Sequence, residues 1–139
     1  MSAPSVPRPA VGAVVFHRNA VLLVHRARAP AAGEWAIPGG RLHWGESLQA
    51  AAEREVLEET GIRIHAREPV FAFDVIERDP AGHCHLHYVI IDLEADYLGG
   101  EPRAADDARD ARWVRPEELA ELPVNATTRR LLHERYGMG

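Results

Sequence analysis

Three glutamates, Glu55, Glu58 and Glu59, are spaced so that they would meet on one side of a helix. Positions i, i+3 and i+4 share a helix face. Like charges at these spacings repel each other, and partial burial would raise the cost further. A hard divalent cation removes that repulsion, because Mg²⁺ and Mn²⁺ prefer carboxylate oxygen ligands. The spacing therefore indicates a metal-binding helix end, although a solvated glutamate-rich turn has the same pattern.

The residues around these glutamates form a longer pattern, which favours the metal site. Gly40 is followed after five residues by Glu46 and, after seven more, by the run Arg54-Glu55-Val56-Leu57-Glu58-Glu59-Thr60-Gly61-Ile62. So long a match at set spacing arises by chance on the order of once in 10⁹ starts, given average residue usage. The stretch resembles the signature box of the Nudix hydrolases, with every fixed position of the box filled.

The resemblance implies a fold, a reaction and a cofactor. The fold is α/β (α+β), a Nudix-type α/β/α sandwich with a mixed β-sheet between helices. Nudix enzymes hydrolyse nucleoside diphosphates linked to another moiety, and they do so by positioning and by charge stabilisation with metal ions. Mg²⁺ or Mn²⁺ is the implied cofactor, and a small-molecule nucleotide is the implied substrate.

The substrate class stays open at this stage. ADP-ribose or a nucleotide sugar is favoured by the general resemblance to small bacterial Nudix proteins. The alternative is a nucleoside triphosphate pyrophosphohydrolase that clears oxidised or non-standard nucleotides. A non-catalytic Nudix domain that senses a ligand is the third reading, which the filled signature box disfavours.

The resemblance also assigns metal ligands. Glu55 and Glu59 are implied as direct ligands, and Glu58 as a ligand directly or through water. The backbone carbonyl of Gly39 is a further implied ligand. One of these glutamates is also implied to orient or deprotonate the attacking water, and the sequence does not decide which.

Two further charged residues of the box have expected roles beside these ligands. Arg54 lies next to Glu55 and four residues before Glu58, so it is expected to pair with a glutamate and hold it in place. Glu46, at the helix entrance, is expected either to join the metal shell or to pair with Arg54.

Four residues outside the predicted helix are candidate substrate contacts. Gly40 lets the backbone turn tightly and approach phosphate. Arg26 leaves a predicted strand toward the glycine-rich loop, where its guanidinium could hold phosphate. Trp44 either stacks on a base or packs in the core. Asp107, in a late polar loop, either completes the site or caps a turn.

Apolar runs and turn signals predict the elements that position these residues. Strands are expected over 11–16, 21–26, 35–37, 70–77, 84–94 and 111–114. Ser47 and Gly61 bound a predicted helix over 47–60, Pro116 is a helix start signal, and Asn125 caps a final helix that reaches residue 136. Residues 1–9 are predicted to be a Pro-rich, flexible tail of one domain over 1–139.

Composition restricts the location and the partners. No apolar run approaches the roughly 20 residues that cross a bilayer, and the start lacks a signal-peptide pattern, so no membrane partner is expected. One cysteine, Cys84, is typical of a cytoplasmic protein. The net charge of −5 disfavours a nucleic acid polymer as partner. A homodimer is compatible with the sequence.

Three alternating histidines, His83, His85 and His87, form a second candidate metal motif. Along one strand their spacing spans roughly 13 Å, which is too long for one compact ion site. We therefore expect either a hydrated strand face at these histidines or one histidine that contacts the substrate.

Overall fold

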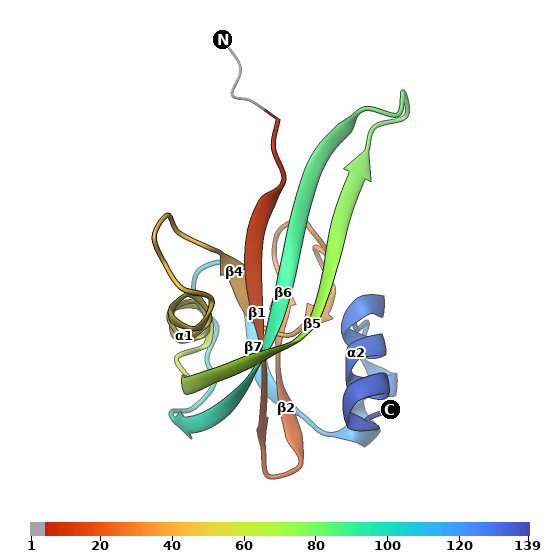
Figure 1. Cartoon of the computed structure of the whole chain (residues 1–139). Helices are drawn as coiled ribbons and strands as arrows, with labels where there is room; N and C mark the ends of the chain where they lie inside the picture. The colour runs from red at the N-terminus through yellow and green to blue at the C-terminus, as the bar shows by residue number, and fades with distance from the viewer. Residues whose placement is uncertain (1–4) are drawn as a thin grey trace.

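The computed structural model describes residues 5–139, and within this range seven strands form one mixed sheet (Figure 1). The strand order is β3-β2-β1-β6-β5, with β4 paired to β1 and β7 paired to β2. β1 and β6 run parallel, and the other named pairs are antiparallel. The strands are β1 (Arg8–His17), β2 (Ala20–Arg26), β3 (Trp35–Ala36), β4 (Gly39–Arg41), β5 (Arg63–Arg78), β6 (Cys84–Gly99) and β7 (Ala108–Val114).

Two α-helices cover opposite sides of the sheet: α1 (Leu48–Thr60) and α2 (Ala126–Tyr136). Small residues of α1 pack against one face of the sheet, in a core cluster that also contains Leu93 of β6. Leucines of α2 pack in a second cluster with Val14 of β1 on the other face. The alternation of side chains along β1 serves both clusters. This arrangement confirms the predicted α/β/α sandwich with a mixed sheet.

The ends of α1 follow from local backbone chemistry. The hydroxyl oxygen of Ser47 accepts a hydrogen bond from the Ala50 N–H at 3.1 Å, which satisfies a free amide of the first turn. Gly61 adopts a left-handed φ of 75°, and its N–H donates to the Leu57 carbonyl at 2.9 Å. The predicted helix bounds are therefore confirmed.

The predicted N-terminal tail needs a correction. Arg8 and Pro9 are the first residues of β1, and they pair with Tyr88 and Val89 of β6. The Pro9 carbonyl also accepts a hydrogen bond from Leu42 at 3.2 Å. A proline is tolerated here because it lies at the start of the strand, and its carbonyl can still accept a hydrogen bond. Residues 1–4 of the predicted tail lie outside the described residues.

Several predicted elements differ from the structure: β6 continues to Gly99, β7 begins at Ala108, and β4 was not predicted. β5 begins at Arg63 rather than at residue 70. Its first part has buried Ile64 alternating with exposed neighbours, and irregular pairing around Pro69 interrupts the pattern that marks a strand. Pro116 starts a 3₁₀ helix, η1 (Pro116–Glu121), in place of an α-helix.

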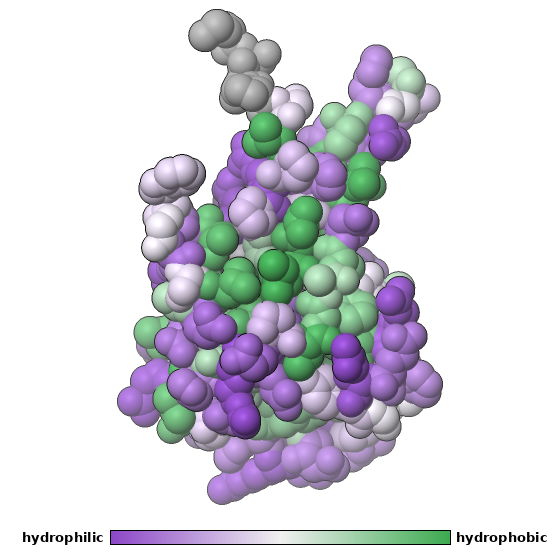
Figure 2. Space-filling model, viewed as in Figure 1, coloured by the Kyte–Doolittle hydropathy of each residue, from purple (hydrophilic) through white to green (hydrophobic). Residues whose placement is uncertain are grey.

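β5 and β6 extend beyond the body of the molecule as a long hairpin (Figure 1). The turn at its tip is closed by the Asp79 carboxylate, which accepts hydrogen bonds from the Ala81 and His83 amides at 2.9 Å each. Ile76 and Val89 on this hairpin are exposed. Figure 2 shows apolar residues gathered in the middle of the visible face with polar residues around them. In the part of the chain that the structure covers, no helix is both long and apolar enough to cross a membrane.

Candidate active site

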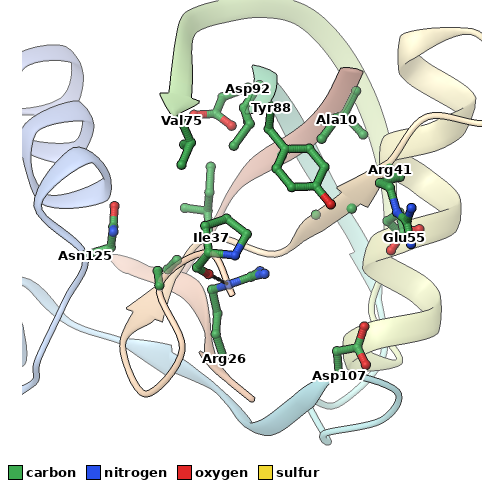
Figure 3. Close-up of a pocket in the computed structure, with 18 of the residues that line it drawn as sticks. Ala10, Arg26, Ile37, Arg41, Glu55, Val75, Tyr88, Asp92, Asp107 and Asn125 are labelled. Atoms are coloured by element: carbon green, nitrogen blue, oxygen red, sulfur yellow. Dashed lines mark hydrogen bonds between the residues drawn. The ribbon is translucent and has the colours of Figure 1, made fainter. Parts of the chain in front are cut away.

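A cleft of about 1170 Å³ opens at the end of the sheet near the last turns of α1. Its walls come from β1, the loop after β2, β4, α1, the β5/β6 hairpin and the first turn of α2. Figure 3 shows residues from all these directions pointing toward a shared space, with Glu55 on one side and Asn125 on the other. The cleft therefore joins the predicted glutamate cluster to a larger binding surface.

All three predicted glutamates line this cleft. Glu55 is half-buried, Glu58 is exposed and Glu59 is buried, with only 5% of its surface exposed. One Glu59 carboxylate oxygen accepts a hydrogen bond from the Gly39 N–H at 3.2 Å. The helix spacing thus brings the three carboxylates to one wall, as predicted, and β4 fixes one of them.

Two glycines of β4 leave room for this arrangement. A Cβ atom at Gly40 would fall on the carboxylate of Glu55, so only glycine lets this side chain lie against the strand. A Cβ atom at Gly39 would collide with the carbonyl oxygen of Val11 on the neighbouring β1. Both glycines line the cleft, as expected for Gly40 as a substrate contact.

Arg54 joins the acidic side chains of the motif. Its guanidinium donates two hydrogen bonds to Glu46, at 2.7 and 2.8 Å. It also donates to Glu55 at 2.6 Å, to Glu58 at 3.2 Å and to the carbonyl of Arg41 at 3.0 Å. The planar fork of arginine is suited to such simultaneous, paired contacts. Arg54 therefore sets the positions of two of the three cleft glutamates.

The same contacts show one of the two roles expected for Glu46. Both of its carboxylate oxygens are bound by Arg54, and Glu46 is not among the residues that line the cleft. The hydrogen bonds from Arg54 lower the pKa of Glu46 to about 2, with a smaller contribution from the His43 amide. The structure therefore shows the pairing with Arg54, and a role for Glu46 in the metal shell stays a prediction.

Burial raises the pKa of Glu59 from 4.5 to about 7. The Gly39 amide and the positive charge of Arg26 oppose this rise, whereas the negative charges of Glu55 and Asp107 add to it. Arg26 and Asp107 are therefore close enough to Glu59 to act on its charge. Burial and the neighbouring carboxylates make ionised Glu59 unfavourable, and a bound cation would offset this cost.

Arg26 and Asp107 both line the cleft, and Asp107 lies on the side of the C-terminal end of α1 (Figure 3). The Arg26 Nε–H donates to the Pro30 carbonyl at 2.6 Å, which orients the guanidinium at the cleft wall. Asp107 is exposed and forms an ion pair with Arg28 at 3.1 Å. Its backbone carbonyl accepts from the Ala27 N–H at 3.0 Å, so the loop before β7 is tied to the loop after β2.

Trp44 does not pack in the core, and its expected role of stacking on a base stays a prediction. Its side chain is fully exposed, so the packing role is wrong, and it is not among the residues that line the cleft. The Glu46 amide donates to the His43 carbonyl, and the His43 amide donates to the Glu46 carboxylate, each at 3.0 Å. These bonds close a turn with Trp44 and Gly45 at its tip, and the tip points to solvent.

The donors at the cleft are of the kind that hard divalent cations prefer. Glu55, Glu58 and Glu59 supply carboxylate oxygens, and the space kept open by Gly40 lies next to one of them. Within residues 5–139, however, no three His, Cys, Asp or Glu side chains stand in a ready-made metal arrangement. In this state Glu55 and Glu58 are held by Arg54 instead.

One cleft residue was missed from the sequence. Asp92 lies in the middle of β6, is 2% exposed and lines the cleft. An acidic residue inside the apolar run Ile90-Ile91-Asp92-Leu93 was the signal that could have identified it. Asn125 was expected only as a helix cap; it caps α2 and also lines the cleft.

Known proteins share this motif and this fold. The model of the NUDIX domain matches residues 6–134. An ADP-ribose pyrophosphatase from Methanocaldococcus jannaschii is 34% identical over 116 residues, which are 84% of this chain and 66% of that protein. The nucleoside triphosphatase NudI of Escherichia coli (strain K12) is 30% identical over 107 residues, which are 72% of this chain and 74% of that protein.

Solved structures agree with these matches. The crystal structure of a MutT NUDIX hydrolase from Burkholderia pseudomallei superimposes with a TM-score of 0.73 and 31% identity, and the match covers 94% of this chain and 99% of that one. The domain match, the relatives and the shared architecture agree with the complete signature box on α1. The chain therefore belongs to the NUDIX family of hydrolases.

Proposed function

We propose that this protein hydrolyses the pyrophosphate bond of a nucleoside diphosphate linked to another moiety, with ADP-ribose as the leading substrate and Mg²⁺ or Mn²⁺ as cofactor. The observation that carries the proposal is the wall of three α1 carboxylates at a cleft that also holds Arg26 and Asp107. The similarity to a protein named ADP-ribose pyrophosphatase supports the choice of substrate.

The reaction needs an attacking water and a leaving phosphate. The water oxygen bonds to one phosphorus, the bridging P–O bond breaks, and the leaving oxygen keeps the electron pair. A base at the cleft takes the proton from the water. With ADP-ribose the products would be AMP and ribose 5-phosphate.

The chain's own residues divide this work. Glu59, fixed by the Gly39 amide, and Glu55, which lies against Gly40, are the proposed direct metal ligands. Glu58 completes the acidic wall. A bound divalent ion supplies positive charge that stabilises the charge developing on the phosphate oxygens. Arg26, which also lines the cleft, would hold a phosphate.

A second candidate function is hydrolysis of nucleoside triphosphates. The similarity to the nucleoside triphosphatase NudI favours it. The same carboxylates would serve, because both reactions break a phosphoanhydride bond. The two candidates differ in what the rest of the cleft binds: a terminal phosphate or a ribose.

Product release from a substrate panel tests the proposal. ADP-ribose, nucleotide sugars, the standard dNTPs and oxidised dGTP would each be incubated with Mg²⁺, with Mn²⁺ and with EDTA. We expect metal-dependent cleavage of ADP-ribose above the others, and none in EDTA. Preferred cleavage of a triphosphate would select the second function, and no cleavage of any compound by folded protein would support a ligand-sensing domain.

Variants on α1 connect the activity to the acidic wall. Glu59→Gln should lower kcat by several orders of magnitude while an amide oxygen still accepts the Gly39 hydrogen bond. Glu53→Gln is the matched control, because Glu53 is on the same helix but accepts from the Ala66 amide away from the cleft. Near-wild-type turnover in Glu59→Gln would show that the metal-site assignment is wrong.

A further inference from the structure

Asp92 has a buried carboxylate oxygen without a partner. Its Oδ1 atom is the single buried side-chain oxygen or nitrogen in residues 5–139 that makes no hydrogen bond. Folded proteins pair almost all such atoms, because leaving one unpaired in a low-dielectric site is costly. The contacts of the free protein do not explain why a buried aspartate stands at this position, so we looked for a partner outside the chain.

The backbone next to Asp92 is built around the carboxylate. Gly12 of β1 is the register partner of Asp92 across the parallel β1/β6 pair. A Cβ atom at Gly12 would fall on Oδ1 of Asp92, and it would also press on Ile37. Glycine is thus the residue that leaves this carboxylate room at the cleft.

The surroundings of Asp92 are apolar and belong to the cleft. Ile37, Phe73, Val75 and Ile90 line the cleft together with Asp92. Figure 3 shows Asp92 near Val75 and at the opposite end of the view from Asp107. Apolar walls with one polar group are typical of sites that hold a flat organic ring and fix its orientation. The cleft thus has an acidic end at α1, where the phosphates would bind, and an apolar part in which Asp92 is the buried carboxyl group.

The neutral and the ionised form of this carboxyl suit different rings. Burial raises the pKa of Asp92 from 3.8 to about 7, and none of the ion pairs within residues 5–139 includes it. A neutral carboxyl carries one O–H donor and one carbonyl acceptor side by side. That pair complements the ring nitrogen and the amino group of adenine. An ionised carboxylate has acceptors only, which would complement the two adjacent N–H donors of guanine.

We propose that Asp92 is a specificity-determining residue, which reads the base of the nucleotide substrate through paired hydrogen bonds to the amino group and the adjacent ring nitrogen of adenine. The proposal rests on the proposed function, since that function supplies adenine as the base and places the phosphates at the α1 end. The base then extends toward the apolar part, and Asp92 gains the partner that the free protein does not give it.

Binding of fragments tests this without any cleavage. Calorimetry would measure the Kd of AMP, GMP and ribose 5-phosphate, with Mg²⁺ present, for wild type, Asp92→Asn and Asp92→Ala. We expect wild type to bind AMP about tenfold more tightly than GMP. Asp92→Ala should lose about tenfold in AMP affinity and nothing for ribose 5-phosphate. Asp92→Asn should keep the AMP affinity, because an amide offers the same donor and acceptor pair.

Asp96→Asn is the matched control, since Asp96 is on the same strand and exposed, and lies outside the cleft. It should leave the ratio of AMP to GMP affinity unchanged. An unchanged ratio in Asp92→Ala would overturn the proposal, and so would an equal loss for AMP and ribose 5-phosphate, which indicates a structural role. A wild-type preference for GMP that Asp92→Asn abolishes would overturn the assignment to adenine.

Failure of the proposed function would look different. If wild type did not cleave ADP-ribose but bound AMP over GMP through Asp92, the base-reading role would stand and the reaction would need another substrate with the same base. If wild type cleaved ADP-ribose and the Asp92 variants kept its base preference, the reaction would stand and the role of Asp92 would be overturned.

Discussion

At the scale of single residues, the guanidinium of Arg54 connects the acidic side chains of the box. It binds both oxygens of Glu46 and one oxygen each of Glu55 and Glu58. Glu46 lies outside the cleft and holds the Arg54 guanidinium in place. Arg54 can therefore position Glu55 and Glu58. The hydrogen bonds to Glu46, first of all, raise the pKa of Arg54 further above its usual range.

The change Arg54→Lys tests this positioning role. Lysine keeps the charge, but its single ammonium cannot bind Glu46 with two parallel bonds while also reaching Glu55 and Glu58. We expect kcat to fall by at least about tenfold, because misplaced catalytic groups lose rate steeply. The KM should change less, and the circular dichroism spectrum should not change. The measurement is steady-state kinetics on the preferred substrate.

Arg67→Lys is the control for this change. Arg67 forms an exposed ion pair with Asp96 at 3.5 Å, and exposed pairs contribute little. It should leave kcat unchanged. Equal kcat values for Arg54→Lys and wild type would mean that charge alone, without the fork geometry, is sufficient.

At the scale of elements, α1 carries the three cleft glutamates, and a cap defines each of its ends. Ser47→Ala removes the hydroxyl that accepts from the Ala50 amide. We expect a loss of about 1 kcal/mol in the free energy of unfolding, typical for an N-cap. Ser47→Asp should restore it, because a carboxylate caps the same amide and favours the positive end of the helix. Urea unfolding of the three proteins measures both effects.

The activity of the Ser47 variants separates stability from catalysis. Ser47 is not among the residues lining the cleft, so kcat should stay close to wild type in both variants. A fall in kcat with unchanged stability would indicate that the cap moves the glutamates.

The same elements show what can be predicted from sequence and why. Ser47 and Gly61 identify the bounds of α1 because cap chemistry involves only neighbouring backbone groups. The adjacent glutamates Glu58 and Glu59 are indistinguishable in the sequence, yet one is exposed and the other buried. The difference comes from the packing of α1 against β4, which depends on contacts distant in the chain.

Two further residues show the same limit. Packing in the core was one expected role of Trp44, because large aromatic side chains usually pack, but the turn from His43 to Glu46 turns the side chain outward. Asp92 depends on Gly12, which lies far from it in the sequence, and only the parallel pairing of β1 and β6 brings the two together. The sequence patterns therefore did not predict those side-chain positions that depend on contacts between residues distant in the chain.

At the scale of the whole molecule, the buried Asp92 makes stability depend on pH. Its pKa in the folded protein, about 7, is above its ordinary value of 3.8, so the folded state binds this proton more tightly. The contribution of this bound proton to the free energy of unfolding is fully present below pH 3.8, and it is lost as the pH rises through about 7. The free energy of unfolding therefore falls by an amount on the order of a few kcal/mol across this window.

The variant Asp92→Asn isolates this contribution, because its amide does not ionise. Urea unfolding in EDTA would compare it with wild type at about pH 5 and about pH 8. We expect the variant to gain stability relative to wild type as the pH rises, since wild type alone must bury a charge at pH 8. A difference between the two proteins that does not change with pH would show that Asp92 titrates normally.

The pairing of β1 with β6 also has a consequence during protein synthesis. Arg8 of β1 pairs with Tyr88 of β6, so β1 can bind its parallel partner only after roughly 80 more residues have been made. In contrast, β5 and β6 are joined by a short turn. A ribosome that adds about 5–20 residues per second needs several seconds to deliver that partner. Until then β1 has only β2 and β4 as its partners in the sheet. The nascent chain can therefore close its sheet, and with it the cleft, only after β6 has left the ribosome.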